Sequence, residues 1–105
     1  MFLVAGVFVI DGGAIFSLKE RRKIILKVKD LFKNNGFSIC ELSSEKFNFL
    51  KFGFSACSKE VGFLRDKVNF LKEKIYQNFE VCFFDVSEID YEDEESFASF
   101  NTGYK

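Results

Sequence analysis

The chain has 105 residues, a formal net charge of −1, 48% hydrophobic residues and 30% charged residues. This length fits one domain with one core, and this composition excludes a disordered chain and a membrane-embedded one. Up to Phe52 there are nine Lys or Arg and five acidic residues, whereas from Gly53 onward there are six Lys or Arg and eleven acidic residues. A uniformly basic nucleic-acid-binding protein is therefore excluded, but a local basic patch is not.

Histidine is absent, and Cys40, Cys57 and Cys82 lie far apart in apolar runs. The spacing fits neither a disulfide framework nor a CxxC zinc site, so we expect three reduced thiols packed as small hydrophobic side chains, no metal and no other cofactor. Without histidine, Ser-His-Asp and Cys-His catalysis are excluded. The apolar run at residues 1–10 lacks a preceding basic region and is too short to span a bilayer, which predicts a strand in a cytoplasmic protein that does not contact membranes.

The first half of the chain predicts a strand followed by a helix. Both alternating faces of Phe2–Ile10 are apolar, as in a central strand that is covered on both sides. Ser17 and Glu20 have the S-x-x-E spacing of a capping box, and Asn34-Asn35-Gly36 provides a left-handed stop. The helix between these signals has an apolar face formed by Leu18, Ile24, Ile25, Val28, Leu31 and Phe32.

The second half predicts a hairpin, a helix and a strand. Phe37–Leu42 and Phe47–Cys57 form the hairpin, and Val81–Ile89 is the last strand. Residues 90–105 are acidic and lack an apolar period, which predicts a flexible tail. The helix between the hairpin and the last strand is capped by Ser58, ends near Gln77, and has apolar positions at Val61, Leu64, Val68, Leu71 and Ile75.

This element order predicts a ferredoxin-like α+β fold, βαββαβ, with two helices on one face of a four-stranded antiparallel sheet. The domain covers residues 1–89 and the tail covers residues 90–105. The fold hosts many functions, so it does not decide this one.

The first helix provides the candidate RNA-binding residues. Its cations away from the apolar face could contact phosphates together, whereas Arg21 lies nearer that face and would fix the loop around Gly12-Gly13. The alternative is a solvated helix face, which charged stripes usually are. The candidates are Lys19, Arg21, Arg22, Lys23 and Lys27.

Two other patterns have weaker functional interpretations. Asp11-Gly12-Gly13 before a capped helix has the form of a phosphate-binding turn, but a tight turn explains the glycines as well, and no nucleotide-binding motif is present. Val7-Phe8-Val9 and Lys51-Phe52-Gly53-Phe54 weakly match the RNP motifs of RNA-recognition domains. Strand parity instead predicts that Phe52 and Phe54 are core residues under the helices.

The sheet face opposite the helices supports an alternative function. If Phe8 and Phe84 point inward, then Val7, Val9 and Phe83 lie on that face. Such a patch predicts a homodimer or a protein-interaction scaffold. The acidic run at residues 92–95 lacks the pattern of a calcium loop, so it would either keep the protein soluble or fold back onto the basic helix. No catalytic residue is predicted.

The chain resembles the YlxP-like family in three stretches, most specifically in Ser17-Leu18-Lys19-Glu20-Arg21-Arg22, where the family shows S-L-K-E-[KR]-R. The other stretches are Gly6-Val7 and the run from Gly53 to Ser58. The resemblance implies a ferredoxin-like domain without an established activity, often encoded beside ribosome-maturation genes, and an accessory role associated with RNA or the ribosome rather than an enzyme. This chain has Phe47-Asn48-Phe49 where the family usually has Trp-Gln.

Overall fold

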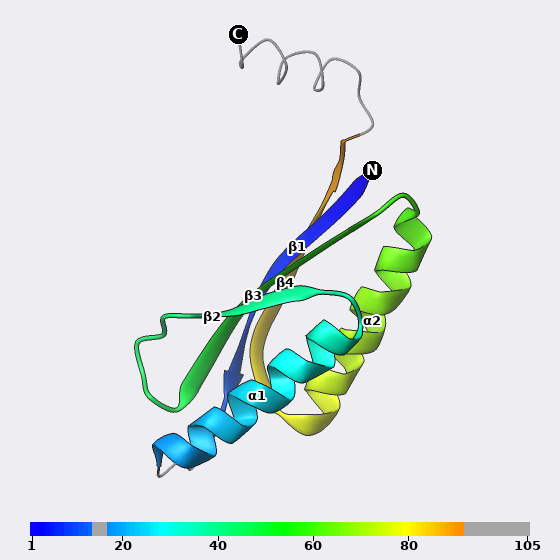
Figure 1. Cartoon of the computed structure of the whole chain (residues 1–105). Helices are drawn as coiled ribbons and strands as arrows, with labels where there is room; N and C mark the ends of the chain where they lie inside the picture. The colour runs from blue at the N-terminus through cyan, green and yellow to red at the C-terminus, as the bar shows by residue number, and fades with distance from the viewer. Residues whose placement is uncertain (14–16, 92–105) are drawn as a thin grey trace, which may run out of the picture.

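The computed structural model describes residues 1–13 and 17–91, which form one sheet and one helical layer. The strands follow the order β2-β3-β1-β4, and each neighbouring pair is antiparallel. Both helices cover the same face of the sheet (Figure 1). The predicted ferredoxin-like fold is therefore confirmed. The elements are β1 (Phe2–Asp11), α1 (Leu18–Asn34), β2 (Ser38–Leu42), β3 (Phe49–Ser58), α2 (Val61–Asn78) and β4 (Glu80–Asp90).

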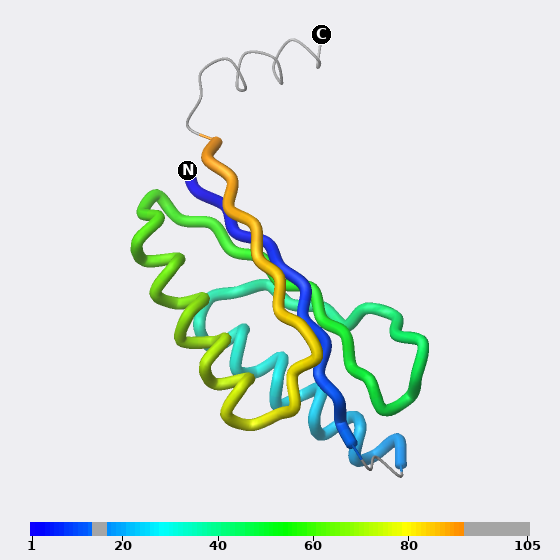
Figure 2. Tube along the Cα trace, turned by 180° about the vertical axis from the view of Figure 1, so that it is seen from behind, coloured from blue at the N-terminus to red at the C-terminus, as the bar shows by residue number. Residues whose placement is uncertain are grey.

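The two ends of the described chain lie at one end of the sheet, and α1 begins at the other (Figure 2). The Tyr91 N–H donates a 2.8 Å hydrogen bond to the Met1 carbonyl oxygen. Strand β4 continues through Asp90, one residue past the predicted boundary of the domain. Residues 92–105, and with them the predicted tail, lie outside the described part of the chain.

The predicted ends of the helices are partly correct. Ser17 caps α1, because its Oγ accepts a 3.2 Å hydrogen bond from the Glu20 N–H, and the chain leaves α1 through Gly36 at φ +82°. The prediction that Ser58 caps α2 is wrong. Ser58 is the last residue of β3, and Glu60 precedes α2 without a side-chain capping bond.

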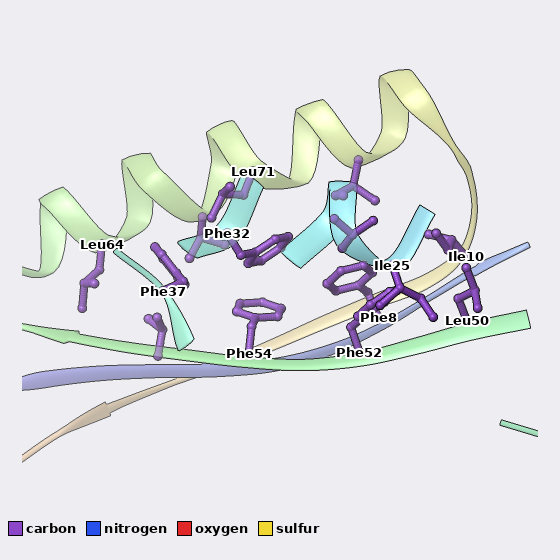
Figure 3. Close-up of a cluster of buried hydrophobic side chains, with 14 residues drawn as sticks. Phe8, Ile10, Ile25, Phe32, Phe37, Leu50, Phe52, Phe54, Leu64 and Leu71 are labelled. Carbon is purple, nitrogen blue, oxygen red and sulfur yellow. The ribbon is translucent and has the colours of Figure 1, made fainter. Parts of the chain in front are cut away.

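Phenylalanine rings fill the space between the helices and the sheet. Phe8 on β1 stacks on Phe32 of α1 at 5.3 Å, on Phe52 of β3 at 5.2 Å and on Phe84 of β4 at 5.1 Å between ring centroids. Phe8, Phe32 and Phe52 are fully buried, and Figure 3 shows these three rings and Phe54 between the two layers. The core interpretation of Phe52 and Phe54 is confirmed, so neither ring is available to stack on a base.

Gly6 provides the room that Phe54 needs. A Cβ at this position of β1 would collide with the Phe54 ring and lie 2.6 Å from the Asp85 carbonyl oxygen. The Phe54 ring therefore occupies the space that a side chain at position 6 would fill.

Strand β1 is central in the sheet, but the prediction that it is covered on both sides is wrong. Its even-numbered side chains Val4, Phe8 and Ile10 are buried, whereas odd-numbered positions alternate onto the other face. Each helix crosses between two parallel strands, α1 from β1 to β2 and α2 from β3 to β4. The two strand pairs run in opposite directions and the crossovers pass across the sheet in opposite directions, so two right-handed crossovers place both helices on one face. The opposite face, which we call the open face, is covered by no helix of the described chain.

One residue of the predicted helix stripe departs from the core. Ile25, Val28 and Phe32 are buried as expected, but Leu18, the first residue of α1, is 58% exposed. The stripe therefore packs onto the sheet only after the first turn.

Candidate nucleic-acid interface

Three cations at the start of α1 are open to solvent. The side chains of Lys19, Arg22 and Lys23 are exposed, and none of them forms an ion pair within residues 1–13 and 17–91. Lys19 and Lys23 are four residues apart, which places them on one side of the helix. These two side chains could contact successive phosphates.

Lys27 continues this side of α1 toward the end of α2. Its Nζ lies 5.9 Å from the centroid of the Phe79 ring, just past the C-terminus of α2. The side chain is exposed. The structure therefore brings Lys19, Lys23 and Lys27 onto one surface, as the spacing predicts.

Arg21 has a different environment from its cationic neighbours. Its guanidinium donates to Glu41 Oε2 at 2.7 Å and, through Nε, to the Phe47 carbonyl oxygen at 3.3 Å, and it lies 5.5 Å from the Phe47 ring centroid. The Arg21 side chain is 21% exposed. Arg21 thus fixes a loop, but this loop joins β2 to β3 and is not the predicted loop at Gly12-Gly13.

A pocket of about 410 Å³ opens beside this ion pair. Its wall includes Arg21, Glu41, Ser43 and Lys46. Glu41 neutralises Arg21, so Lys46 provides the remaining positive charge of the wall. The pocket extends the cationic surface at the start of α1 without forming a separate anion site.

The glycine pair is a turn whose N–H groups are already used. The Gly12 N–H donates to the Asn48 carbonyl oxygen at 2.7 Å, and the Gly13 N–H donates to Asp11 Oδ1 at 2.8 Å. Gly13 has φ +63°, a conformation that favours glycine. These two donors are therefore not directed at a ligand, which favours the tight-turn interpretation over the phosphate-binding one.

Charge is divided between the layers of the molecule. Helix α1 has seven Lys or Arg and two acidic residues, and α2 has four Lys or Arg and two acidic residues. Strand β4 has four acidic residues and no Lys or Arg. The helical layer is thus strongly positive and one edge of the sheet is negative. The asymmetry between the halves of the sequence does not reveal this division, because both helices are basic.

Exposed aromatic rings on α2 are a feature that the sequence interpretation missed. Phe63 is 53% exposed and Phe70 is 43% exposed. Lys67 Nζ lies 5.8 Å from the Phe63 ring centroid, and Lys74 Nζ lies 5.6 Å from that of Phe70. The signal was present, because both phenylalanines lie off the apolar stripe of α2 and each has a lysine four residues later.

These rings lie beside the end of α1. Lys67 Nζ donates to Asn35 Oδ1 at 3.3 Å, which joins the two helices. A pocket of about 260 Å³ lies between the rings and is also lined by Asp66 and Asn35. Basic and aromatic side chains are therefore interleaved on the outer surface of the helical layer.

The cysteines differ from the prediction. All three are free thiols, as expected, but each is exposed rather than packed in the core. Cys40 pairs with Gly53, and Cys57 pairs with Leu3, at positions that point to the open face. Alternation along the strands, rather than the apolar run around each cysteine, decides their exposure.

The described residues contain no grouping of three or more His, Cys, Asp or Glu side chains that could hold a metal ion. In residues 1–13 and 17–91 no polar or charged side chain is buried. No described helix has the length and apolar character needed to cross a membrane.

One exposed ion pair links α2 to β4. Arg65 donates from Nε and Nη2 to the two carboxylate oxygens of Glu88 at 2.8 and 2.9 Å. These hydrogen bonds lower the pKa of Glu88 and raise the pKa of Arg65. Both residues of the pair line a groove of about 550 Å³ between α2 and β4, and Val4, Val68 and Val86 form the apolar part of its lining.

Comparison with solved structures supports the fold alone. A de novo designed protein, Foldit4, is 9% identical with a TM-score of 0.52, covering 86% of this chain and 98% of the design. A putative chlorite dismutase is 15% identical with a TM-score of 0.56, covering 96% of this chain and 48% of that protein. Comparison with curated proteins finds no match.

The family comparison covers nearly the whole sheet and both helices. The model described as "Protein of unknown function (DUF503)" matches residues 6–88, from Gly6 of β1 to Glu88 of β4. The matched range contains the basic start of α1 and the aromatic rings of α2. The chain therefore belongs to this family of proteins of unknown function, DUF503.

Proposed function

We propose that this protein is a non-enzymatic accessory protein that binds RNA through the outer surface of its helical layer. The observation that carries the proposal is the set of exposed cations at the start of α1, Lys19, Arg22 and Lys23, which form no ion pair in the described chain. RNA supplies the phosphates that such a surface would contact. The resemblance to the YlxP-like family adds a cytoplasmic ribosome-associated role to this proposal.

The position of these cations in the helix supports an anionic partner. The N-terminus of a helix carries about half a positive charge, so each nearby cation costs roughly 0.3–1 kcal/mol. Four cations, Lys19, Arg21, Arg22 and Lys23, lie in the first six residues of α1, and Glu20 is the acid of the first turn. A phosphate at this end would be attracted by the helix dipole and by the cations together.

The aromatic side chains of α2 indicate the form of RNA. Exposed rings beside lysines are the typical platform for unpaired bases, and stacking contributes about 1–3 kcal/mol per base. Phe63 and Phe70 are seven residues apart, and therefore about 10 Å apart along the helix. We therefore propose single-stranded RNA, with phosphates on α1 and bases on α2.

The test compares two lysines that differ only in location. Lys23→Glu should weaken binding of a fluorescently labelled single-stranded RNA on the order of tenfold, which is about 1.4 kcal/mol. Lys51→Glu makes the same change of charge on the open face, away from the helical layer, and should leave affinity nearly unchanged. Equal losses in both variants would show attraction to the overall charge, and no wild-type binding at low salt would refute the proposal.

A further inference from the structure

The open face of the sheet is largely apolar. The strand register places the side chains of Val7 and Val9 on this face, as the strand pattern predicts. Phe83 beside Val9 is 46% exposed, and Ile89 beside Leu3 is 42% exposed. An apolar area of this extent is unusual on a monomer and is typical of an association surface.

The size of this face matches the lower range of specific interfaces. The three long strands contain 31 residues, and with a rise of ~3.3 Å and a spacing of ~4.8 Å they span about 500 Å² of sheet. Two such faces in contact would bury roughly 1,000 Å² in total, which is about the minimum for a biological interface. A dimer through this face should therefore depend on concentration.

Side-chain size varies along the open face. Small residues occupy its centre, because Ala5 of β1 lies between Ser55 of β3 and Ser87 of β4. Larger side chains lie toward both ends, with Val9 and Phe83 at one and Leu3 and Ile89 at the other. Two facing sheets pack about 10 Å apart, so these larger side chains would supply the contacts at both ends of the face.

The charges on the open face select the partner. Lys51 lies on β3 and Asp85 lies on β4, so they flank β1 on opposite sides. Neither forms an ion pair in the described chain. A twofold axis along β1 exchanges β3 with β4, so it would bring Lys51 of each copy toward Asp85 of the other.

We infer that the open face binds a second copy of this chain, with the sheets face to face about a twofold axis along β1. The arrangement covers the apolar side chains, forms two reciprocal Lys51–Asp85 pairs and encloses the exposed thiol of Cys57. Both helical layers then face outward. The dimer does not depend on RNA binding, and it would present two copies of the proposed RNA-binding surface.

Sedimentation velocity of the full chain under reducing conditions, over a range of concentrations, tests this inference. We expect a monomer–dimer equilibrium. Val7→Asp places a carboxylate beside Asp85 and should weaken the dimer at least tenfold, whereas Lys23→Glu on the helical layer should leave it unchanged. A wild-type monomer at millimolar concentration, or a Val7→Asp variant that dimerises as well as the wild type, would overturn the inference.

A charge exchange keeps the test informative if Val7→Asp does not fold. Lys51→Asp and Asp85→Lys should each weaken the dimer, and the double variant should regain most of the affinity. Failure of the double variant to regain it would refute the proposed pairing.

The thiol of Cys57 gives a readout of location. Its labelling by a maleimide should slow as the dimer forms, with Cys40 and Cys82 replaced by Ser. Labelling that slows only when RNA is added would place RNA on the sheet and overturn the inference.

Discussion

The two faces of the sheet come from the same strands but have opposite environments. On β1, Phe8 is fully buried beneath the helices, whereas Val9 beside it points to the open face. Aromatic rings fill one face, and small residues form the centre of the other. The comparison teaches that one set of alternate positions stabilises the fold and leaves the other set available for association.

The largest expected effect separates the faces by stability. Phe8→Ala removes a ring that stacks on three others, so it should lower the free energy of unfolding by about 3–5 kcal/mol. Val9→Ala on the open face should cost less than about 1.5 kcal/mol, because Val9 is only partly buried in the monomer and points away from the rings of the core. Urea unfolding at low protein concentration measures both values, and similar losses would contradict the comparison.

Two glycines sharpen the same contrast without removing any side chain. Gly6→Ala forces a methyl group against the Phe54 ring and should cost about 1–3 kcal/mol. Gly53→Ala on the open face meets Leu42 Cδ1 at 3.2 Å, which is the end of a flexible side chain, so the change should stay within about 0.5 kcal/mol. Thermal melting of both variants checks the difference, and the reverse order of effects would contradict the assigned faces.

Neighbouring arginines allow a similar comparison between structure and binding. Arg21→Gln loses the contacts with Glu41 and Phe47, so it should destabilise the protein by about 1 kcal/mol. Arg22→Gln should leave the melting temperature unchanged and weaken RNA binding. An Arg22→Gln variant that melts earlier than Arg21→Gln would show that the two roles are exchanged.

The smallest effect concerns pH and the exposed pair between Arg65 and Glu88. The folded-state pKa of Glu88 is lowered, so the stabilisation is fully present above the ordinary pKa of glutamate and is lost as pH falls through the lowered value. Glu88→Gln should therefore flatten the acid side of the stability curve slightly. The decrease in melting temperature from pH 7 to acid pH, compared between the wild type and Glu88→Gln in low salt, measures this difference. An equal decrease in both proteins would show that the pair contributes nothing to stability.

Local patterns in the sequence predicted the fold well because they depend on short-range physics. The period of α1, the Ser17 cap and the alternation along β3 each follow from neighbouring residues, and each was confirmed. The prediction that β1 is covered on both faces was wrong, because the face on which each helix packs is decided by the crossover connections and not by the residues of the strand. The prediction that the cysteines are packed in the core was wrong for a related reason, since an apolar run does not show which face of a strand is covered.

The candidate site was predictable only in part. Spacing placed Lys19, Lys23 and Lys27 on one side of α1, but the partner of Arg21 is Glu41 on β2, twenty residues away in the sequence. Such a contact follows from the tertiary arrangement and has no local signal. The exposed rings of α2 did have a local signal, because these phenylalanines lie off the apolar stripe of the helix. The abundance of phenylalanine in this chain outweighed that signal.

The salt dependence of RNA affinity tests the central claim most directly. Each phosphate contact with a single strand contributes about 0.7 to the slope of log affinity against log salt. For the wild type we predict a steep decline with salt, and for Lys19→Ala combined with Lys23→Ala a slope that is about 1.4 shallower. An affinity that does not change with salt, or a double variant with the wild-type slope, would contradict the assignment of RNA phosphates to the start of α1.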